Sequence, residues 1–323
     1  MNTIPRIEPQ TGASASIPKV RQRALTRLGI SPETAGTPKV VRSLPLNVAG
    51  LQVARTLLAH VLHRRRTRNR VTSDWALTLA EEGIVVIPDF LPAPVFAAVQ
   101  AEFRRALEHA STLRLEKTAT SHVFVQYEDA SRRMGRFEEG VIDHDYVTVW
   151  PDDSACPMIR EHLLRNKRML GLVSEVSGFA GIPAPRGDLD RMYLSNRAAS
   201  HDPQTEFHED IFCNDWRAWF SVNEWTEENA AMTYAPRSHQ MSVSRLAFEY
   251  WNSVTNTRDG GSWRASPGYR RWLGVEARSM CCPPNTLVLG NMCGYHARGA
   301  FQQGHIREAI QMSFRHNPWR LRG

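Results

Sequence analysis

The sequence predicts a mainly β fold with flanking helices, built on a double-stranded β-helix core, also called a jelly-roll or cupin-like core. Short apolar strands in the second half of the chain, such as residues 285–296, lead into polar side chains that can point inward. Helical patterns are concentrated before these strands, as in a sheet core buttressed by helices. With 323 residues, 42% of them hydrophobic, the chain can bury one large core, so we expect one main domain.

We divide the chain into an extension, residues 1–70, and a main domain, residues 71–323. Residues 1–47 are rich in Pro, Ser, Thr, Gly and Arg and have no sustained periodicity, so they should lie loosely over the domain. In residues 48–66, apolar side chains recur at helical spacing, and a basic run over residues 63–70 follows. The pattern predicts a basic amphipathic helix.

Most of the net charge of +7 lies in this extension, where thirteen Lys or Arg residues stand against two Glu. The simplest interpretation is a helix docked on the domain with its charged end in solvent. The pattern is also typical of a helix that contacts a membrane surface, a partner or nucleic acid, and of organellar transit peptides. We expect no nucleic-acid partner. Peripheral contact of this helix with a membrane is the alternative to a helix that is only docked on the domain. The rest of the chain is close to neutral, so the charge says little about the substrate.

The main domain should contain alternating helices and strands. We expect helices over 74–82, 92–111 and 159–177, strands over 84–87 and 190–196, a helical insert from about 240 to 254, and a loop from there to 272. The five cysteines form no Cys-x-x-Cys pair, which suggests reduced thiols and a cytoplasmic location. No apolar run approaches the ~20 residues that span a bilayer. The oligomeric state is left open.

The segment His208-Glu209-Asp210 is the strongest candidate for a metal site. On an extended strand, His208 and Asp210 point the same way and Glu209 points the opposite way. A second imidazole would complete the set of two histidines and one carboxylate that non-haem Fe(II) oxygenases use, with coordination positions left open. Zn²⁺ accepts the same ligands, so a Zn-dependent hydrolase or isomerase is the alternative.

The second imidazole is expected at His296, which ends an apolar strand, and Arg307 follows on the next strand. His201, His239 and His305 are the alternatives. A planar guanidinium can bind the distal carboxylate of a keto acid such as 2-oxoglutarate in bidentate fashion. Hydrolysis has no need for such a group, so Arg307 favours the oxygenase. A rival triplet, Asp143-His144-Asp145, cannot present its His with either Asp on a regular strand.

The chain resembles the phytanoyl-CoA dioxygenase-like family of Fe(II)/2-oxoglutarate oxygenases over roughly residues 72–316. Three further segments carry the resemblance in order: Glu82–Leu91, Trp219–Trp225 and Asn229–His239. The resemblance implies that His208, Asp210 and His296 bind Fe(II) and that Arg307 holds 2-oxoglutarate. It also implies that Trp219 packs against this co-substrate and that Asn196 contributes a polar contact, although a turn explains Asn196 equally well.

Two positions depart from the family pattern. The turn Pro236-Arg-Ser-His239 has Arg where the family has Gly, and Arg298 replaces a small hydroxyl residue two positions after the distal histidine. On a regular strand Arg298 would point into the same cavity as His296, where it needs an anionic partner. We expect this partner to be the substrate. A carboxylate of 2-oxoglutarate and Glu206 are the alternatives.

The activity that this resemblance implies is oxidation of a C–H bond of a small-molecule metabolite, with Fe(II), 2-oxoglutarate and O2, and with release of succinate and CO2. Hydroxylation is the default outcome, while desaturation, ring formation and epimerisation differ only in the fate of the substrate radical. A non-catalytic binder that uses the basic extension would instead show salt-dependent association and no oxygen consumption. Because all the implied site residues lie beyond position 195, removal of residues 1–45 should leave turnover intact.

Overall fold

The computed structural model describes residues 40–111, 115–117, 122–126, 134–138, 146–149, 156–179, 186–193, 203–256, 263–302, 304–314 and 316–320. Its strands are β1 (Ile84–Ile87), β2 (Leu115–Lys117), β3 (His122–Gln126), β4 (Met134–Glu138), β5 (Tyr146–Val149), β6 (Arg186–Tyr193), β7 (Trp216–Ser221), β8 (Thr233–Tyr234), β9 (Arg278–Ser279), β10 (Thr286–Asn291), β11 (His296–Ala297) and β12 (Ile306–Phe314). Its helices are α2 (Leu44–Val48), α3 (Leu51–Thr67), α4 (Asp74–Glu82), α5 (Ala93–Ser111), α6 (Pro157–Ile159), η1 (Arg160–Leu164), α7 (Lys167–Ser177), η2 (Pro203–Thr205), α8 (Val243–Thr255) and α9 (Pro267–Leu273).

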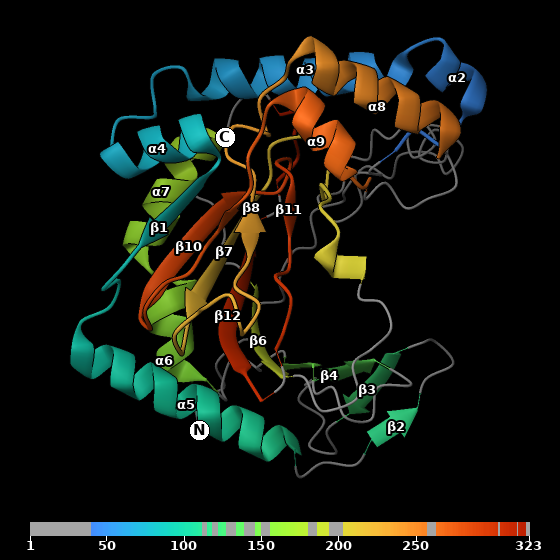
Figure 1. Cartoon of the computed structure of the whole chain (residues 1–323). Helices are drawn as coiled ribbons and strands as arrows, with labels where there is room; N and C mark the ends of the chain where they lie inside the picture. Colours follow the sequence, from blue (N-terminus) through green and yellow to red (C-terminus); the bar gives the residue numbers. More distant parts are fainter. Residues whose placement is uncertain are drawn as a thin grey trace, which may run out of the picture.

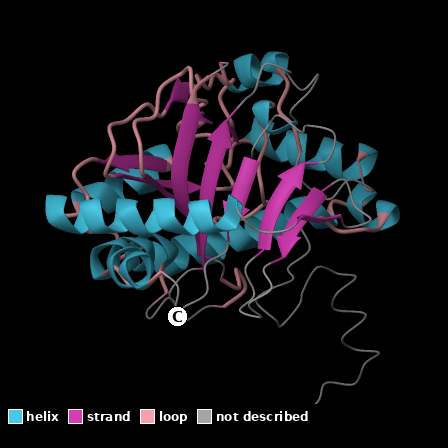
Figure 2. Ribbon diagram, turned by 90° about the horizontal axis from the view of Figure 1, so that it is seen from below, coloured by secondary structure: helices cyan, strands magenta, loops and turns pink. Residues whose placement is uncertain are grey.

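The described strands form two antiparallel sheets (Figure 1). The larger sheet has the order β1-β10-β7-β12-β6-β5-β4-β3-β2, and the smaller has the order β11-β8-β9. Helices flank the strands in the view from below (Figure 2). The predicted combination of sheets and flanking helices is therefore confirmed, while the double-stranded β-helix remains a prediction at this level.

Side chains alternate between two cores along the central strands, as the pleat of a strand requires. Leu287 and Leu289 of β10 pack with the helices α4, α5 and α7 in one hydrophobic cluster. Val288, between them, packs with Trp219 and Trp225 in a second cluster. The helices thus cover one face of the larger sheet, and the other face lines an interior that contains aromatic side chains.

Several elements begin and end where the sequence predicts. α4 spans the predicted Asp74–Glu82, its N-cap Ser73 accepts the backbone N–H of Ala76, and Gly83 ends it at φ 80°. β1 matches the predicted strand. The predicted helix over 159–177 is interrupted at Arg165, and α7 starts afresh with the Asn166 side chain as its N-cap.

The predicted loop between α8 and residue 272 is wrong at its end, where α9 forms. Ser266 accepts the N–H of Tyr269, Pro267 occupies the first turn, and Gly274 ends the helix in the left-handed region. These are the ordinary start and stop signals of a short helix. The Gly and Arg content of the segment obscured them.

α3 is docked on the domain through its polar side. Gln52, Thr56 and His60 are buried, whereas Leu58 and Val61 are exposed. The His60 ring lies 3.2 Å from the carbonyl of Phe212, and the helix also contacts α7 and α8. None of the helices in the described part of the chain has the length and apolarity needed to cross a bilayer.

Candidate metal centre

His208 and His296 are direct neighbours across two antiparallel segments. The N–H of His208 donates to the His296 carbonyl at 2.9 Å, and the N–H of His296 donates to the His208 carbonyl at 3.0 Å. In such a hydrogen-bonded pair both side chains leave from the same face. Their ring centroids are accordingly 4.7 Å apart. The backbone itself therefore sets the spacing of the two imidazoles.

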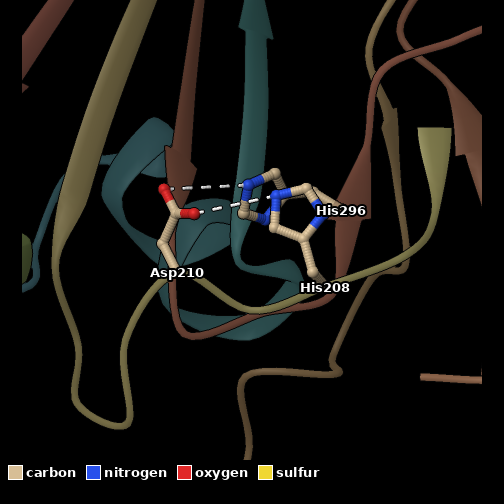
Figure 3. A group of neighbouring side chains, drawn as sticks. All are labelled: His208, Asp210 and His296. Atoms are coloured by element: carbon tan, nitrogen blue, oxygen red, sulfur yellow. Dashed lines mark ion pairs between the residues drawn. The ribbon is translucent and has the colours of Figure 1, made fainter. Parts of the chain in front are cut away.

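Asp210 points to the same side as His208, as the alternation predicts. Its N–H donates to the Met292 carbonyl, and its two carboxylate oxygens lie 3.7 Å from His208 Nε2 and 4.0 Å from His296 Nε2 (Figure 3). The three ligand atoms all lie within 4.8 Å of one another. In the part of the chain that the structure describes, this is the cluster whose donor atoms converge closely enough for one metal ion.

Both imidazoles are oriented by backbone carbonyls. Nδ1 of His208 lies 2.7 Å from the Glu206 carbonyl, and Nδ1 of His296 lies 3.0 Å from the Gly294 carbonyl. A carbonyl oxygen can only accept, so each Nδ1 carries the proton and each Nε2 keeps a lone pair that faces Asp210. Burial lowers the pKa of His296 to about 4, although the Asp210 carboxylate opposes this shift. His296 is thus neutral at physiological pH, the form that binds a metal.

The donor set fits a six-coordinate Fe(II) that keeps positions open. Two imidazole nitrogens and one carboxylate oxygen would hold it, the donor set of oxygenases with two histidines and one carboxylate. The rival triplet at 143–145 and Asn196 lie outside the described residues.

Arg217 is a site residue that the sequence reasoning missed. Its guanidinium Nη2 lies 2.7 Å from Oδ2 of Asp210, and both side chains are about one-fifth exposed. Arg217 and Trp219 are two positions apart on β7, so they face the same interior. That alternation was the available signal, because any residue two positions from Trp219 shares its side of the strand.

Glu209, between His208 and Asp210, points away from the site and forms an ion pair with Arg245 of α8. Both side chains are almost completely buried. The Arg245 guanidinium also donates to the carbonyls of Ser238 and Cys293, at 2.9 and 3.0 Å, and lies 4.2 Å from the ring centre of Tyr295. Arg245 therefore contacts the residues next to the metal-binding side chains of both segments. Nothing in the sequence marked α8 as the source of this partner.

Arg307, the predicted co-substrate residue, is buried on β12. Its guanidinium donates to the Ala230 carbonyl and lies 5.5 Å from the ring centre of Trp225. Ala309, two residues on, packs in the same cluster as Trp219 and Trp225, so the alternation places Arg307 on the interior face as well. Arg307 thus faces the same interior as Trp219 and Trp225, and its role towards the co-substrate stays a prediction.

Trp219 and Arg298 also lie close to the strands of the site. Trp219 is buried and its indole N–H donates to Gln311 of β12 at 2.9 Å. Arg298 follows β11, two residues after His296, and is half-buried. Its backbone N–H donates to the Gln204 carbonyl at 2.8 Å. The roles assigned to both side chains stay predictions.

Comparison with known proteins gives one family match. The model of the phytanoyl-CoA dioxygenase (PhyH) family matches residues 79–268, more than half of the chain. A search of curated proteins gives no match.

Solved structures with a related fold were also found. The epimerase SnoN from nogalamycin biosynthesis, in complex with Fe³⁺, alpha-ketoglutarate and nogalamycin RO, is 17% identical, with a TM-score of 0.48 over 75% of this chain and 82% of that one. The alpha-ketoglutarate-dependent carbocyclase SnoK is 16% identical, with a TM-score of 0.44 over 77% and 85%. EctD from S. alaskensis with bound Fe is 14% identical, with a TM-score of 0.45 over 77% and 78%.

Proposed function

Because this chain belongs to the phytanoyl-CoA dioxygenase family, we propose that it oxidises a C–H bond of a small-molecule metabolite, most simply by hydroxylation, with release of succinate and CO2. The protein is a non-haem iron enzyme that depends on 2-oxoglutarate, with O2 as the usual co-substrate of the family. The proposed catalytic unit is residues 71–323, onto which α3 is docked. The proposed location of the protein is the cytoplasm, where thiols stay reduced. All five cysteines are free, which supports this proposal.

The observation that carries this proposal is the convergence of three ligand atoms from two segments that the backbone locks together. His208, Asp210 and His296 would hold the iron through Nε2, a carboxylate oxygen and Nε2. When bound, iron would supply the redox chemistry that couples the oxidative decarboxylation of 2-oxoglutarate to the reduction of O2. Every other contribution comes from the chain, which must orient the co-substrate, keep water out and position the substrate.

Arg307 is the proposed anchor of the co-substrate. Its planar guanidinium is buried among aromatic side chains, where a bidentate pair with the distal carboxylate of 2-oxoglutarate is only weakly screened by water. Trp219 is proposed to form part of the wall against which the co-substrate packs. The same buried arginine argues against the alternative of a Zn-dependent hydrolase or isomerase, which has no keto acid to bind.

Arg217 is proposed to determine which carboxylate oxygen of Asp210 binds the metal. The guanidinium lies 2.7 Å from Oδ2, while Oδ1 lies 3.7 Å from His208 Nε2. This arrangement favours binding of the metal by one carboxylate oxygen and keeps further positions for the co-substrate. Arg298 remains the proposed partner of an anionic group on the substrate.

Co-substrate turnover without a known substrate tests this proposal. The purified protein, loaded with Fe(II) and supplied with 2-oxoglutarate and O2, should form succinate slowly, and a metabolite panel should contain a compound that accelerates this reaction. His208→Ala should form none. Hydrolysis or isomerisation by a Zn-loaded protein, with no succinate from the Fe(II)-loaded one, would instead establish the alternative.

A further inference from the structure

α3 exposes a continuous stripe that changes from apolar to basic along the helix. Leu57, Leu58 and Val61 are 40–51% exposed, and Arg64, Arg65 and Arg68 continue the same stripe at helical spacing. The buried side of this helix is the polar one, as described above. An apolar outer face is the reverse of what an ordinary surface helix presents to water.

α8, which contacts α3, also exposes apolar side chains. Val243, Tyr250 and Trp251 are all exposed, Trp251 to 67%. Contacts join α8 to α2 and α3, and Asn47 of α2 donates to the Ser253 carbonyl of α8 at 2.8 Å. The three helices lie together at the top of the molecule in Figure 1. We call the surface formed by these exposed residues of α3 and α8 the α3–α8 face.

The charges of this region have one sign. Among the described residues from 40 to 70 and from 241 to 256, the one acidic residue is Glu249, which is fully buried. The exposed charged residues in these two stretches are all arginines. α9 extends the pattern, since its Trp272 is exposed and its Tyr269 stacks on Phe248 of α8. An apolar surface with tryptophan and arginine but no exposed acid is therefore presented outward.

We propose that the α3–α8 face docks on an anionic lipid bilayer. Leucine and tryptophan side chains would enter the boundary between head groups and acyl chains, and the arginines would contact the phosphates. Nucleic acid offers no place for exposed Leu57, Leu58 and Val61. The combination of both kinds of side chain on one face favours a lipid surface, which provides an apolar layer directly beneath an anionic one.

Charge also argues against two other occupants. A second copy of this face would bring arginines against arginines. Residues 1–39 carry six Lys or Arg and two Glu, so this segment has the same sign of charge as the face. The proposal concerns where the protein resides rather than its chemistry, so it stands or falls separately from the oxygenase assignment.

Flotation of the full-length protein with vesicles tests the proposal. We expect it to float with vesicles of phosphatidylglycerol and phosphatidylcholine and to bind pure phosphatidylcholine far more weakly. Leu58→Gln/Trp251→Gln should weaken binding about tenfold or more, because each buried apolar side chain contributes separately. Arg64→Gln/Arg65→Gln/Arg68→Gln should weaken it about a hundredfold, since each arginine near an anionic surface adds about one tenfold step or slightly less.

α4 and α7 provide matched controls. Leu77 is as exposed as Leu58, and Trp75 is exposed on the same helix, so Leu77→Gln/Trp75→Gln removes one leucine and one tryptophan outside the face. Arg165→Gln/Lys167→Gln/Arg168→Gln removes the same charge at the start of α7. Both control variants should bind the vesicles like the wild type.

Several results would overturn the proposal. One is an absence of flotation, and another is equal weakening by the face and control variants. Loss of binding on deletion of residues 1–39 alone would assign the contact to that segment. Self-association that only the face variants abolish would identify a second copy as the occupant. Tight binding to polyglutamate that Leu58→Gln/Trp251→Gln does not weaken would identify an acidic protein.

Discussion

Arg245 and Glu209 form a buried ion pair directly behind the proposed metal ligands His208 and Asp210, so the side chain between these two residues is fixed from outside the site. The same guanidinium holds the carbonyl of Cys293, three residues before His296. Both ligand-bearing segments are thereby attached to one residue of α8. A substitution of Arg245 should consequently lower the affinity for the metal, although Arg245 is not one of the proposed ligands.

Arg245→Met should therefore weaken metal binding as well as the fold. The substitution leaves two buried carboxylates, Glu209 and Glu249, without this partner, and loss of one such partner typically costs about 3–5 kcal/mol of unfolding free energy. Glu209→Gln/Arg245→Met removes the charge of Glu209 as well and should recover part of that stability, but not the attachment of the two ligand-bearing segments to α8. Co(II) titration monitored by absorbance measures the affinity, and urea unfolding measures the stability.

Arg66→Met is the matched control for that pair of variants. Arg66 is also buried, but it donates to the carbonyls of Pro318 and Arg320, away from the ligand-bearing segments. The Arg66→Met variant should be less stable than the wild type but bind Co(II) with the same affinity. If Arg66→Met and the double variant lose affinity equally, Arg245 has only a general structural role.

Removal of a proposed ligand should abolish metal binding while the fold persists. His208→Ala and Asp210→Ala each leave two ligands, which cannot hold Fe(II) tightly at micromolar metal. The expected result is loss of Co(II) absorbance and of succinate formation, with an unchanged far-ultraviolet circular dichroism spectrum. His305→Ala, at an exposed histidine on the approach to β12, is the control and should behave as wild type. Full binding by both ligand variants would contradict the assignment.

Arg307→Lys should raise the KM for 2-oxoglutarate by about tenfold to a hundredfold, because an ammonium group cannot form the bidentate pair that a guanidinium forms. The KM for the substrate should change much less. Arg298→Ala should give the opposite pattern once a substrate is known. A rise in both constants by the same factor in Arg298→Ala would point to a structural role for that residue.

Buried histidines should make the apo protein sensitive to acid. Burial lowers the pKa of His60 to about 3 and that of His239 to about 4, although a backbone carbonyl opposes the shift in each case. The unfolded chain has a histidine pKa near ~6.5, so it binds more protons than the native state between these values. The stability that depends on these histidines is fully present above pH ~6.5 and is lost as the pH falls towards the folded values.

His239→Gln isolates one of these contributions. Between pH 7 and pH 5, the unfolding free energy of the wild type should fall by about 2 kcal/mol more than that of the variant. Urea unfolding at the two pH values measures this difference. Parallel losses in the two proteins would show that His239 is protonated in the native state as readily as in the unfolded chain.

Truncation should separate the two parts of the N-terminal extension. Deletion of residues 1–39 should leave 2-oxoglutarate turnover intact. A deletion that reaches residue 45 removes Val40 and Val41, which are buried, and should lower the stability. Deletion of residues 1–70 should prevent folding, because it exposes the surfaces that bury Gln52, Thr56 and His60. Thermal unfolding and succinate formation measure these outcomes.

Local signals were enough to predict elements such as α4 and the side chains of the triplet that share a face. Ser73 and Gly83 mark the ends of α4, and alternation along a strand places His208 with Asp210 and turns Glu209 away. Each of these signals acts within a few residues. They also explain why the wider mix of sheets and helices could be predicted from the chain alone.

Long-range partners could not be predicted in this way. Arg245 lies 36 residues after Glu209, and neither residue carries a local sign that the other is its partner. α3 is harder still, since its buried side carries Gln52 and His60. Their polar partners lie outside the helix: the backbone N–H of Val41 donates to Gln52, and the Phe212 carbonyl lies 3.2 Å from the His60 ring. Periodicity gave the helix correctly but could not indicate which side faces the core.

The paired backbone hydrogen bonds between His208 and His296 have a consequence for the metal-free protein. Amide protons held in such a pair exchange slowly with solvent only when the two segments stay joined. If the backbone alone sets the imidazole spacing, these two amides will be protected from deuterium exchange before any ion arrives. Metal binding will then cost little conformational entropy, because the site is already ordered. Different divalent ions will bind to the same rigid pair of nitrogens.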